Sequence, residues 1–293
     1  MKGTIVKGIA GFYYVKEEGR DTPAFQCKAR GVFKKDGIVP AVGDHVAFQL
    51  GEGPEDDGLI TQILPRKNQF IRPPIVNVDC FVVIMAAAHP KPNLALMDKF
   101  LVMAEKSSTD IIVCLNKLDL AKGGLTEEIQ RLYGDVYPVV CLSAESGKHI
   151  EELRGLIRGK QTAFAGPSGV GKSTLLNALL PSAAAQTGDV SKKTKRGRHT
   201  TRHCELFDLG DGTMIFDTPG FTSFEIMEAE EDELQHLFPE MEPFLGACRY
   251  DDCRHLKEPG CMVRQAVEEG KIPRGRYESY KVLLGEIQAK NRY

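Results

Sequence analysis

One stretch of eight residues constrains the fold of this chain more than any other. The residues before it, 162–165, are apolar and predict a buried strand, and residues 173–180 predict an amphipathic helix. The stretch fits the pattern Gly-x-x-x-x-Gly-Lys-Ser/Thr without a gap. It reads Gly166-Pro167-Ser168-Gly169-Val170-Gly171-Lys172-Ser173, and Thr174 follows it. A strand, a glycine-rich turn and a helix are the context in which this pattern cradles a polyphosphate.

The residue types in this stretch each suit that chemistry. Glycines let backbone N–H groups turn inward around phosphates, Lys172 supplies a positive charge to the β and γ phosphates, and the Ser173 hydroxyl can ligate Mg²⁺. A chance glycine-rich turn is the alternative, and the flanking strand and helix argue against it. The sequence therefore predicts a nucleotide site that also takes magnesium.

Composition limits the remaining classes. A chain of 293 residues with 42% hydrophobic residues has room for about two globular domains. The first residues lack the apolar core of a secretion signal, and no stretch approaches the roughly 18 apolar residues of a membrane span. We therefore expect a cytosolic protein that does not contact a membrane. The formal charge of -2 argues against an overall nucleic-acid footprint but leaves local basic patches open.

The first 65 residues or so have a rhythm of their own. Short alternating segments, such as 8–15 and 44–50, are separated by glycine, proline and acidic turns, which predicts a small all-β barrel. Two alternatives are open for the aromatic and basic side chains of this region. Together they form a surface that binds nucleic acid, or the aromatic residues belong to the core and the basic residues are solvated. The candidates are Phe12, Tyr13, Tyr14, Lys28, Arg30, Lys34 and Lys35.

After the proline-rich stretch 65–74, strands and helices alternate. Residues 80–86, 110–115 and 138–142 are apolar runs typical of a parallel sheet that is buried on both faces. Residues 94–106 predict a helix with Asn93 as its N-cap, and residues 150–158 predict another. This pattern predicts a doubly wound α/β domain.

The strand at 110–115 ends in Asn116-Lys117-Leu118-Asp119. The Asp119 carboxylate can accept from guanine N1–H and N2–H₂ together, whereas adenine offers neither donor there. Lys117 can lie along the base, and Asn116 can tether neighbouring loops. Ser143 and Ala144 follow another strand, and a backbone N–H there can meet guanine O6. The short motif is weak alone and strong beside a phosphate loop.

Two further segments follow the phosphate loop. Residues 191–203 are strongly basic and include His199, Thr200 and Thr201; a threonine hydroxyl there can complete the Mg²⁺ shell. The basic run is either a solvated loop or a switch that also touches an anionic partner. Two strands joined by Gly210-Asp211-Gly212 then lead to Asp217-Thr218-Pro219-Gly220. Asp217 can hold Mg²⁺ through water, and the Gly220 N–H can sense the γ phosphate.

Late in the chain, three thiols and one imidazole lie within fourteen residues. They are Cys248, Cys253, His255 and Cys261. This is a complete Cys₃His set for a closed, structural zinc site. Cys80, Cys114 and Cys141 lie in apolar runs instead and are expected as buried thiols. Helices are expected from 230 to 237 and from 274 to 290, the latter with a basic face formed by Arg274, Arg276, Lys281, Lys290 and Arg292.

Together these motifs resemble the five motifs of the GTPase superfamily. Their order differs, because Asn116 to Asp119 and Ser143-Ala144 precede the phosphate loop. Such an order is typical of a circularly permuted GTPase, here with new termini in the former loop after the fourth strand. A permutation keeps the site because the sheet fixes its loops. Phe221 stands where many GTPases have the glutamine that orients the attacking water.

A barrel, a permuted GTPase domain and a Cys₃His module in one chain resemble the bacterial small-ribosomal-subunit biogenesis GTPases, the family of ribosome small-subunit-dependent GTPase A. The segment Gly197 to Thr201 also looks like that family's switch. The resemblance implies an OB-fold over residues 1–68, the GTPase domain over 69–225 and a helical zinc-binding domain over 226–293. It also implies that His199 replaces the missing glutamine.

We therefore expect a monomeric GTP hydrolase that binds GTP and GDP, the 30S subunit and its 16S rRNA. The subunit is expected to stimulate its GTPase activity, and the protein to assist late maturation of the subunit. The expected cofactors are one structural Zn²⁺, and Mg²⁺ with GTP. Two alternatives stay open at this point: a GTP-sensing RNA-binding protein with little hydrolysis, and a phosphotransferase with the same phosphate loop.

Overall fold

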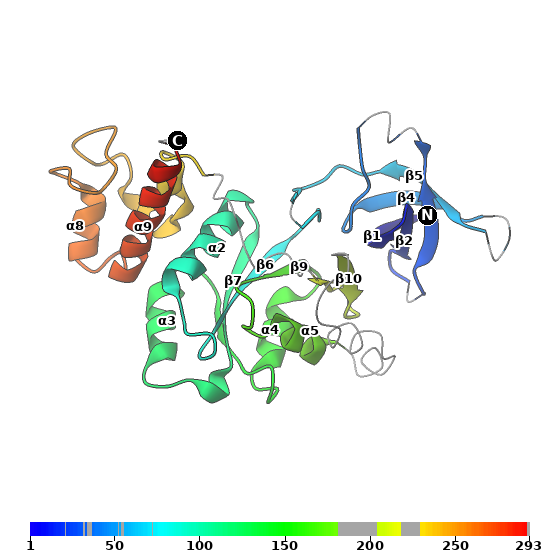
Figure 1. Cartoon of the computed structure of the whole chain (residues 1–293), viewed down its shortest axis with the longest axis horizontal. Coiled ribbons are helices and arrows are strands. Elements are labelled where there is room, and N and C mark those ends of the chain that lie inside the picture. Colours follow the sequence, from blue (N-terminus) through cyan, green and yellow to red (C-terminus); the bar gives the residue numbers. More distant parts are fainter. Residues whose placement is uncertain are drawn as a thin grey trace.

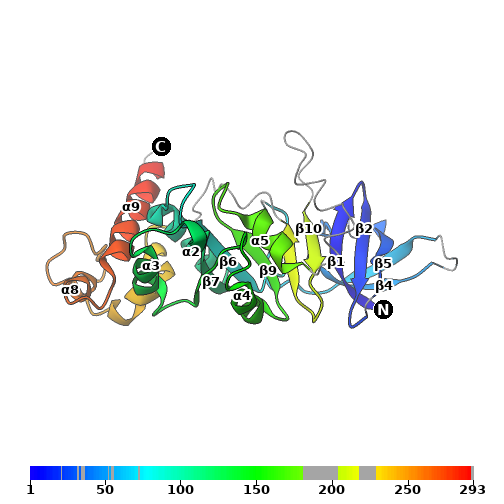
Figure 2. The same ribbon diagram turned by 90° about the horizontal axis from the view of Figure 1, so that it is seen from below.

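The computed structural model describes residues 1–20, 22–31, 33, 37–51, 53, 56–71, 73–180, 204–217 and 229–291. Over these ranges the chain forms three units in a row (Figures 1 and 2): a β-barrel, a central sheet covered by helices, and a helical module. The barrel and the helical module lie at opposite ends of the central sheet. Among the described helices, none has both the length and the apolar character needed to cross a membrane.

The barrel has five strands. They are β1 (Lys2–Ile9), β2 (Phe12–Glu17), β3 (Phe25–Ala29), β4 (His45–Gln49) and β5 (Gly58–Ile63). Their order is β2-β3-β5-β4-β1, and a pairing of β1 with β2 closes the barrel. The predicted all-β barrel is confirmed, although the segment 8–15 is the end of one strand, a turn at Ala10-Gly11 and the start of the next.

Alternation along β2 separates its aromatic side chains. Tyr13 packs against the barrel core beside Val15, which favours the core alternative for this residue. Phe12 and Tyr14 point to the other face, because successive residues of a strand alternate. There they are paired with Lys28 and Gln26 of β3. Lys34 and Lys35 lie outside the described residues.

The central sheet continues from the barrel in the order β10-β11-β9-β6-β7-β8. Its strands are β6 (Cys80–Ala86), β7 (Asp110–Asn116), β8 (Val139–Cys141), β9 (Gln161–Ala165), β10 (Glu205–Asp208) and β11 (Met214–Asp217). Its helices are α2 (Leu94–Lys106), η1 (Leu118–Leu120), α3 (Leu125–Tyr133), α4 (Ile150–Ile157) and α5 (Lys172–Leu179). The side chain of Asn93 accepts from Leu96 N and caps α2, as the sequence predicts.

Apolar cores on both faces of this sheet explain why its strands are continuous apolar runs. All seven residues of β6 are buried. Phe81 and Val83 face one core together with Phe100 and Leu101 of α2, whereas Val82 and Ile84 face the other core, formed with α4 and α5. The doubly wound α/β prediction is confirmed.

The chain order within the sheet corrects one detail of the predicted permutation. When the strands are counted from β9, which leads into the phosphate loop, β10 and β11 are second and third, and β6 is fourth. The chain leaves the sheet after β11 and enters it at β6. The permutation therefore cuts the former loop before the fourth strand, not after it.

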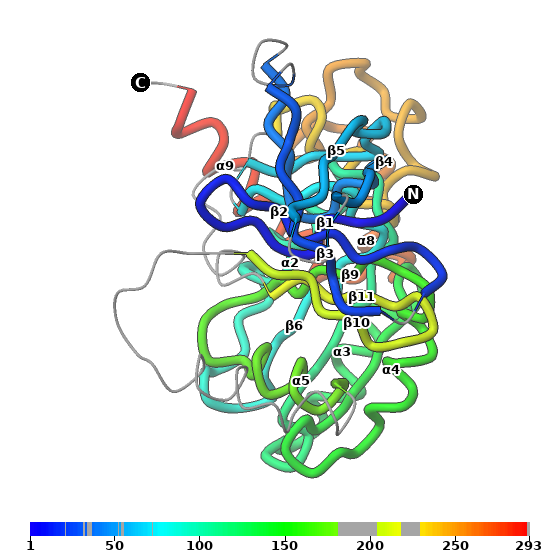
Figure 3. Tube along the Cα trace, turned by 90° about the vertical axis from the view of Figure 1, so that its right-hand side faces the viewer, coloured from blue at the N-terminus to red at the C-terminus, as the bar shows by residue number. Residues whose placement is uncertain are grey.

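One strand pairing joins the barrel to the central sheet. β1 pairs antiparallel with β10, with Lys7 opposite Glu205, and Figure 3 shows the two strands side by side. Ion pairs support the joint, from Lys7 to Glu205 at 3.3 Å and from Lys16 to Asp208 at 3.2 Å. β10 is thus shared between the sheet that carries the phosphate loop and the barrel.

The helical module contains η2 (Leu234–Leu237), η3 (Pro239–Phe244), α8 (Met262–Glu268) and α9 (Arg274–Lys290). The bounds of α9 match the prediction. The helix expected over 230–237 is wrong: a short 3₁₀ helix covers only 234–237, and residues 231–233 before it form a turn. Arg276 was expected on a basic face, but it is buried between α9, η3 and α2.

Candidate functional site

The carboxyl ends of parallel strands bring the predicted nucleotide residues to one edge of the sheet. β11, β9, β6, β7 and β8 run parallel to one another in the sheet. Their ends carry Asn116 on β7, Ser143 after β8, Gly166 after β9 and Asp217 on β11. Ligands of open α/β sheets bind at this edge. The motifs scattered over a hundred residues are therefore neighbours in space.

Two glycines of the phosphate loop are required by close backbone contacts. Gly166 has φ 144°, and a Cβ there would lie 2.3 Å from the Ile84 carbonyl oxygen. Gly171 has φ 98°, and its Cβ would lie 2.4 Å from Asn116 Nδ2. Any side chain at either position would collide with a residue of a neighbouring strand and strain the backbone. The loop thus folds against the ends of β6 and β7.

Asn116 ties three loops together. Its buried amide donates to the Val170 carbonyl at 2.8 Å, and its Oδ1 accepts from Lys117 N at 2.7 Å and from Ala144 N at 3.0 Å. The predicted tether is confirmed. The Ala144 N–H, which the sequence offers to guanine O6, donates here to Asn116, so a contact with the base requires an exchange of this bond.

Lys117 and Asp119 extend from the same loop. Lys117 Nζ donates to the Gly169 carbonyl at 2.7 Å and also to the His89 carbonyl in the loop after β6. Asp119 is exposed, and Ser143 Oγ donates to its Oδ1 at 2.5 Å. The Asp119 carboxylate is therefore fixed by a hydrogen bond and still accessible to a ligand. Sequence reasoning missed His89, because a backbone carbonyl acceptor has no signature in the residue type.

Lys172 lies at the centre of the phosphate loop. Its Nζ donates to the carbonyls of Gly166 and Pro167 at 2.6 and 2.9 Å. Burial lowers the pKa of the Lys172 ammonium to about 8. Ser173 and Thr174 follow on the exposed first turn of α5. A partly desolvated cation beside a helix N-terminus is suited to bind phosphate.

Part of the predicted site lies outside the described residues. His199, Thr200, Thr201 and Gly220 are in this group. Asp217, at the end of β11, is half-buried, and the parallel pairing of β11 with β9 places it near the start of the phosphate loop. The described part of the site therefore holds the base-recognition residues, the phosphate loop and Asp217.

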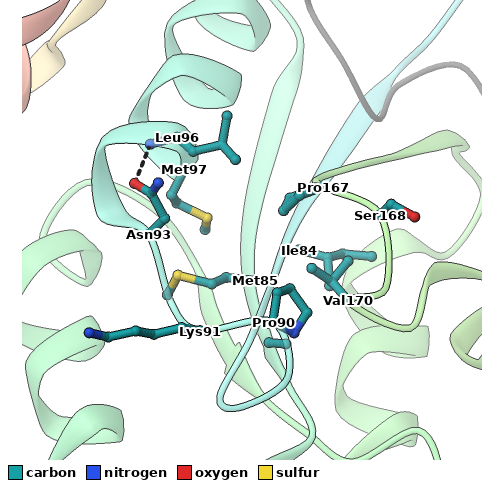
Figure 4. Close-up of a pocket in the computed structure, with 11 residues that line it drawn as sticks. Ile84, Met85, Pro90, Lys91, Asn93, Leu96, Met97, Pro167, Ser168 and Val170 are labelled. Atoms are coloured by element: carbon teal, nitrogen blue, oxygen red, sulfur yellow. Dashed lines mark hydrogen bonds between the residues drawn. The ribbon is translucent and has the colours of Figure 1, made fainter.

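A cavity of about 220 Å³ adjoins the phosphate loop (Figure 4). Pro167, Ser168 and Val170 line it on the side of the loop, and Leu96 and Met97 of α2 line it on the other. Its remaining lining residues are Ile84, Met85, Ala86, Pro90, Lys91 and Asn93. The phosphate loop and the first turn of α2 thus face each other across this space.

The four predicted metal ligands converge in the helical module. One ligand atom from each of Cys248, Cys253, His255 and Cys261 lies within 4.8 Å of the others. His255 Nδ1 lies 3.6, 3.5 and 3.3 Å from the three Sγ atoms, in that order of cysteines. Bond lengths of tetrahedral zinc place a sulfur and a nitrogen ligand about 3.5 Å apart. This group can hold a metal ion, and its donor set is that of structural zinc.

Neighbouring groups fix these ligands. His255 Nε2 donates to Gln235 Oε1 at 2.8 Å, which directs Nδ1 toward the thiols. Met262 N and Arg264 N donate to the sulfurs of Cys248 and Cys261 at 3.4 Å each. Tyr277 of α9 donates to the His255 carbonyl at 2.6 Å. Gln235 was not predicted, since it precedes the cluster by thirteen residues and is not a metal-ligand type.

A phosphate loop, a base-recognition loop tied to it, and a sheet entered at its fourth strand define a circularly permuted P-loop GTPase, flanked by a barrel and a metal-binding module. Comparisons with known proteins agree. The RsgA GTPase family model matches residues 63–227, and the RsgA N-terminal domain model matches residues 2–60.

Relatives and crystal structures match nearly the whole chain. The small ribosomal subunit biogenesis GTPase RsgA of Alkaliphilus metalliredigens is 44% identical over all of this chain and 99% of the relative. YjeQ from Thermotoga maritima is 34% identical, with a TM-score of 0.85 over 98% of each chain. YloQ, described as a circularly permuted GTPase, is 35% identical, with a TM-score of 0.81 over 99% of this chain and 95% of its own. The chain belongs to the RsgA GTPase family and is a GTP-hydrolysing enzyme.

Proposed function

We propose that this protein hydrolyses GTP on the small ribosomal subunit and assists the late maturation of that subunit. The observation that carries the proposal is the nucleotide edge of the sheet, where Asn116 joins the base-recognition loop to the phosphate loop. The names of the relatives refer to biogenesis of the small ribosomal subunit, which supports the choice of partner. We propose further that the subunit stimulates hydrolysis.

In this proposal Asp119 pairs with guanine, Lys117 covers the base, and the loop Gly166 to Thr174 binds the phosphates. Ser143 supports the proposal because it already holds the Asp119 carboxylate. The Mg²⁺ ion is ligated by Ser173, by Thr200 or Thr201, and through water by Asp217; the Gly220 N–H senses the γ phosphate. His199 orients the attacking water in place of glutamine.

The metal of the helical module is zinc in this proposal. Three thiols and one imidazole, with backbone N–H groups directed at two of the sulfurs, support a closed site with no position for water. Zinc supplies no chemistry to hydrolysis. It fixes the conformation of the loop 248–261. Backbone carbonyls of this loop in turn accept hydrogen bonds from the hydroxyls of Tyr277 and Tyr280 of α9.

Contact with 16S rRNA is assigned to the barrel face that carries Phe12, Tyr14 and Lys28. Lys28 Nζ lies 5.2 Å from the centroid of the Phe12 ring, so a cation and an aromatic face stand together on paired strands. Such a surface stacks single-stranded bases and neutralises phosphates. The proposal includes a monomeric protein that acts in the cytoplasm, with a barrel over 1–68, a GTPase domain over 69–225 and a zinc domain over 226–293.

One experiment tests the proposal directly. GTP turnover is measured alone and in titrations with 30S subunits, 50S subunits and naked 16S rRNA. We expect a turnover that rises and saturates with 30S subunits only. Equal stimulation by 50S subunits or naked rRNA would remove the subunit from the proposal. Turnover that stays negligible in every titration would instead favour a GTP-sensing RNA-binding protein.

A further inference from the structure

We propose that Arg276 of the helical module is a positioning residue for the nucleotide site. Through Asp98 it fixes helix α2 opposite the phosphate loop, and it thereby couples the folding of the metal-binding module to guanine-nucleotide affinity. The inference rests on the assignment of the phosphate loop as the nucleotide site, and it is independent of the ribosomal partner.

The module holds the Arg276 guanidinium rigidly. Its Nε and Nη2 atoms donate to the two carboxylate oxygens of Glu240 at 2.6 and 3.1 Å. The Phe238 ring centroid lies 4.6 Å from its Cζ. Only 1% of the Arg276 side chain is exposed. A bidentate pair and an aromatic face leave the guanidinium one orientation, with Nη1 directed out of the module.

The remaining guanidinium nitrogen, Nη1, contacts α2. Nη1 donates to Asp98 Oδ1 at 2.6 Å, and Tyr133 of α3 donates to the same oxygen at 2.9 Å. The Asp98 side chain is also 1% exposed. A buried carboxylate is strongly unfavourable without a charged partner, so Asp98 and Arg276 hold each other in place. The contact therefore fixes the first half of α2 to α9.

The opposite side of α2 faces the cavity described above. Leu96 and Met97, the residues just before Asp98, line it, with Pro167 and Ser168 of the phosphate loop on its far wall (Figure 4). Because open space separates these groups, the first turn of α2 does not pack directly on the phosphate loop. The position of this turn depends on contacts elsewhere on the helix, where Phe100 and Leu101 pack on the sheet and Asp98 forms its buried ion pair with Arg276.

The loop that leads into α2 is bound to the nucleotide site. Lys117 Nζ bridges the carbonyl of His89, in this loop, and the carbonyl of Gly169, in the phosphate loop. A shift of α2 therefore moves His89 relative to Gly169 and disturbs the lysine that lies along the base. The path from the module to the site has few steps: Arg276, Asp98, the start of α2, His89 and Lys117.

The test measures GDP affinity with a fluorescent GDP analogue, together with zinc content and amide hydrogen exchange, in the full chain. Arg276→Met and Arg276→Lys are compared with the wild type. Coupling through packed elements of this kind changes affinity by roughly 2- to 30-fold. We expect GDP affinity to decrease from the wild type through Arg276→Lys to Arg276→Met. Both variants should retain zinc, and amide hydrogen exchange should be faster in residues 87–93. Wild-type affinity in Arg276→Met with zinc retained would overturn the inference.

Because Arg276→Met leaves the buried carboxylates of Asp98 and Glu240 unpaired and can fail to fold, the triple variant Asp98→Asn, Glu240→Gln and Arg276→Met is a second test. Removing all three charges avoids an uncompensated charge, and such replacements are often tolerated. We expect the folded triple variant to keep the loss of affinity, and its recovery to the wild-type value would contradict the proposal. Glu286→Gln is the matched control, since it breaks the exposed 2.6 Å pair of Glu286 with Lys99 between the same two helices. It should leave GDP affinity unchanged.

Discussion

The side-chain amide of Asn116 donates a 2.8 Å hydrogen bond to the carbonyl of Val170, 54 positions further along the chain. In the same buried side chain, Oδ1 accepts from the N–H groups of Lys117 and Ala144. Three loops of the nucleotide site therefore share one residue. The permuted chain order does not disturb this arrangement, because the sheet and not the sequence separation decides which loops meet.

The first prediction concerns this tether. Asn116→Ala leaves three backbone groups without their partner, and each buried group that loses its hydrogen bond costs about 1–3 kcal/mol of stability. We expect a lower unfolding midpoint in urea and a weaker affinity for GDP. Asn177→Ala, an exposed position on α5, is the matched control and should change neither value. Wild-type GDP affinity in Asn116→Ala would show that the tether is not needed to form the site.

The sequence predicted the central sheet well because its information is local. Residues 80–86 and 111–115 are continuous apolar runs, and such runs are typical of a strand that is buried on both faces. The helix over 94–106 has its cap in Asn93, and the cap forms as expected. The phosphate loop and the Asn-Lys-x-Asp motif were identifiable because their chemistry fixes residue types at fixed spacing.

Contacts between units could not be predicted in this way. Arg276 looks like one more cation of a basic helix, and its burial depends on Asp98 and Glu240, which are distant in sequence. The pairing of β1 with β10 likewise involves one residue pair and no local signal. The place of Tyr13 stayed open because three consecutive aromatic residues conceal which face of β2 each of them takes.

A second prediction concerns base choice. Asp119→Asn should weaken GTP binding and improve binding of xanthosine triphosphate, whose C2 carries an oxygen where guanine has an amino group. Hydrogen bonds to a charged group contribute about 1.5–3 kcal/mol, so GTP affinity should fall roughly 10- to 100-fold. Competition titrations with both nucleotides measure this. Asp135→Asn, at another exposed aspartate, is the control. An unchanged preference in Asp119→Asn would remove this carboxylate from base recognition.

A third prediction concerns the metal. Protein purified without chelators should contain about one zinc per chain, because folding and metal binding are coupled in such modules. Cys253→Ser removes one of four ligands and should release zinc and destabilise the helical module more than the GTP site. Cys141→Ser changes a half-buried thiol outside the cluster and should keep the metal. Elemental analysis that finds no zinc in the wild-type protein would exclude the structural role.

The fourth prediction concerns His199. A neutral imidazole can orient a water by accepting a hydrogen bond from it. If this is its role, His199→Ala should lower kcat roughly 10²- to 10⁴-fold at saturating 30S subunits, while nucleotide and subunit binding stay nearly intact. Full turnover at saturating subunits, combined with weaker and less salt-sensitive subunit binding, would make His199 an RNA contact instead.

The last prediction concerns pH. Burial lowers the pKa of Lys172 to about 8, and a bound phosphate should raise it, because the anion favours the charged ammonium. Below pH 8 both forms of the protein are protonated, so GDP affinity should hardly change. Above pH 8 the free protein loses the proton that the complex retains, and affinity should fall by up to about tenfold per pH unit. The stability of the free protein against unfolding should instead rise with pH between pH 8 and the ordinary lysine pKa of about 10.4. In this range the lysine is protonated in the unfolded chain and has lost its proton in the folded protein. Lys172→Arg, whose guanidinium stays charged throughout, is the control and should lose the slope. A slope that is the same in both proteins would assign the pH dependence to another group.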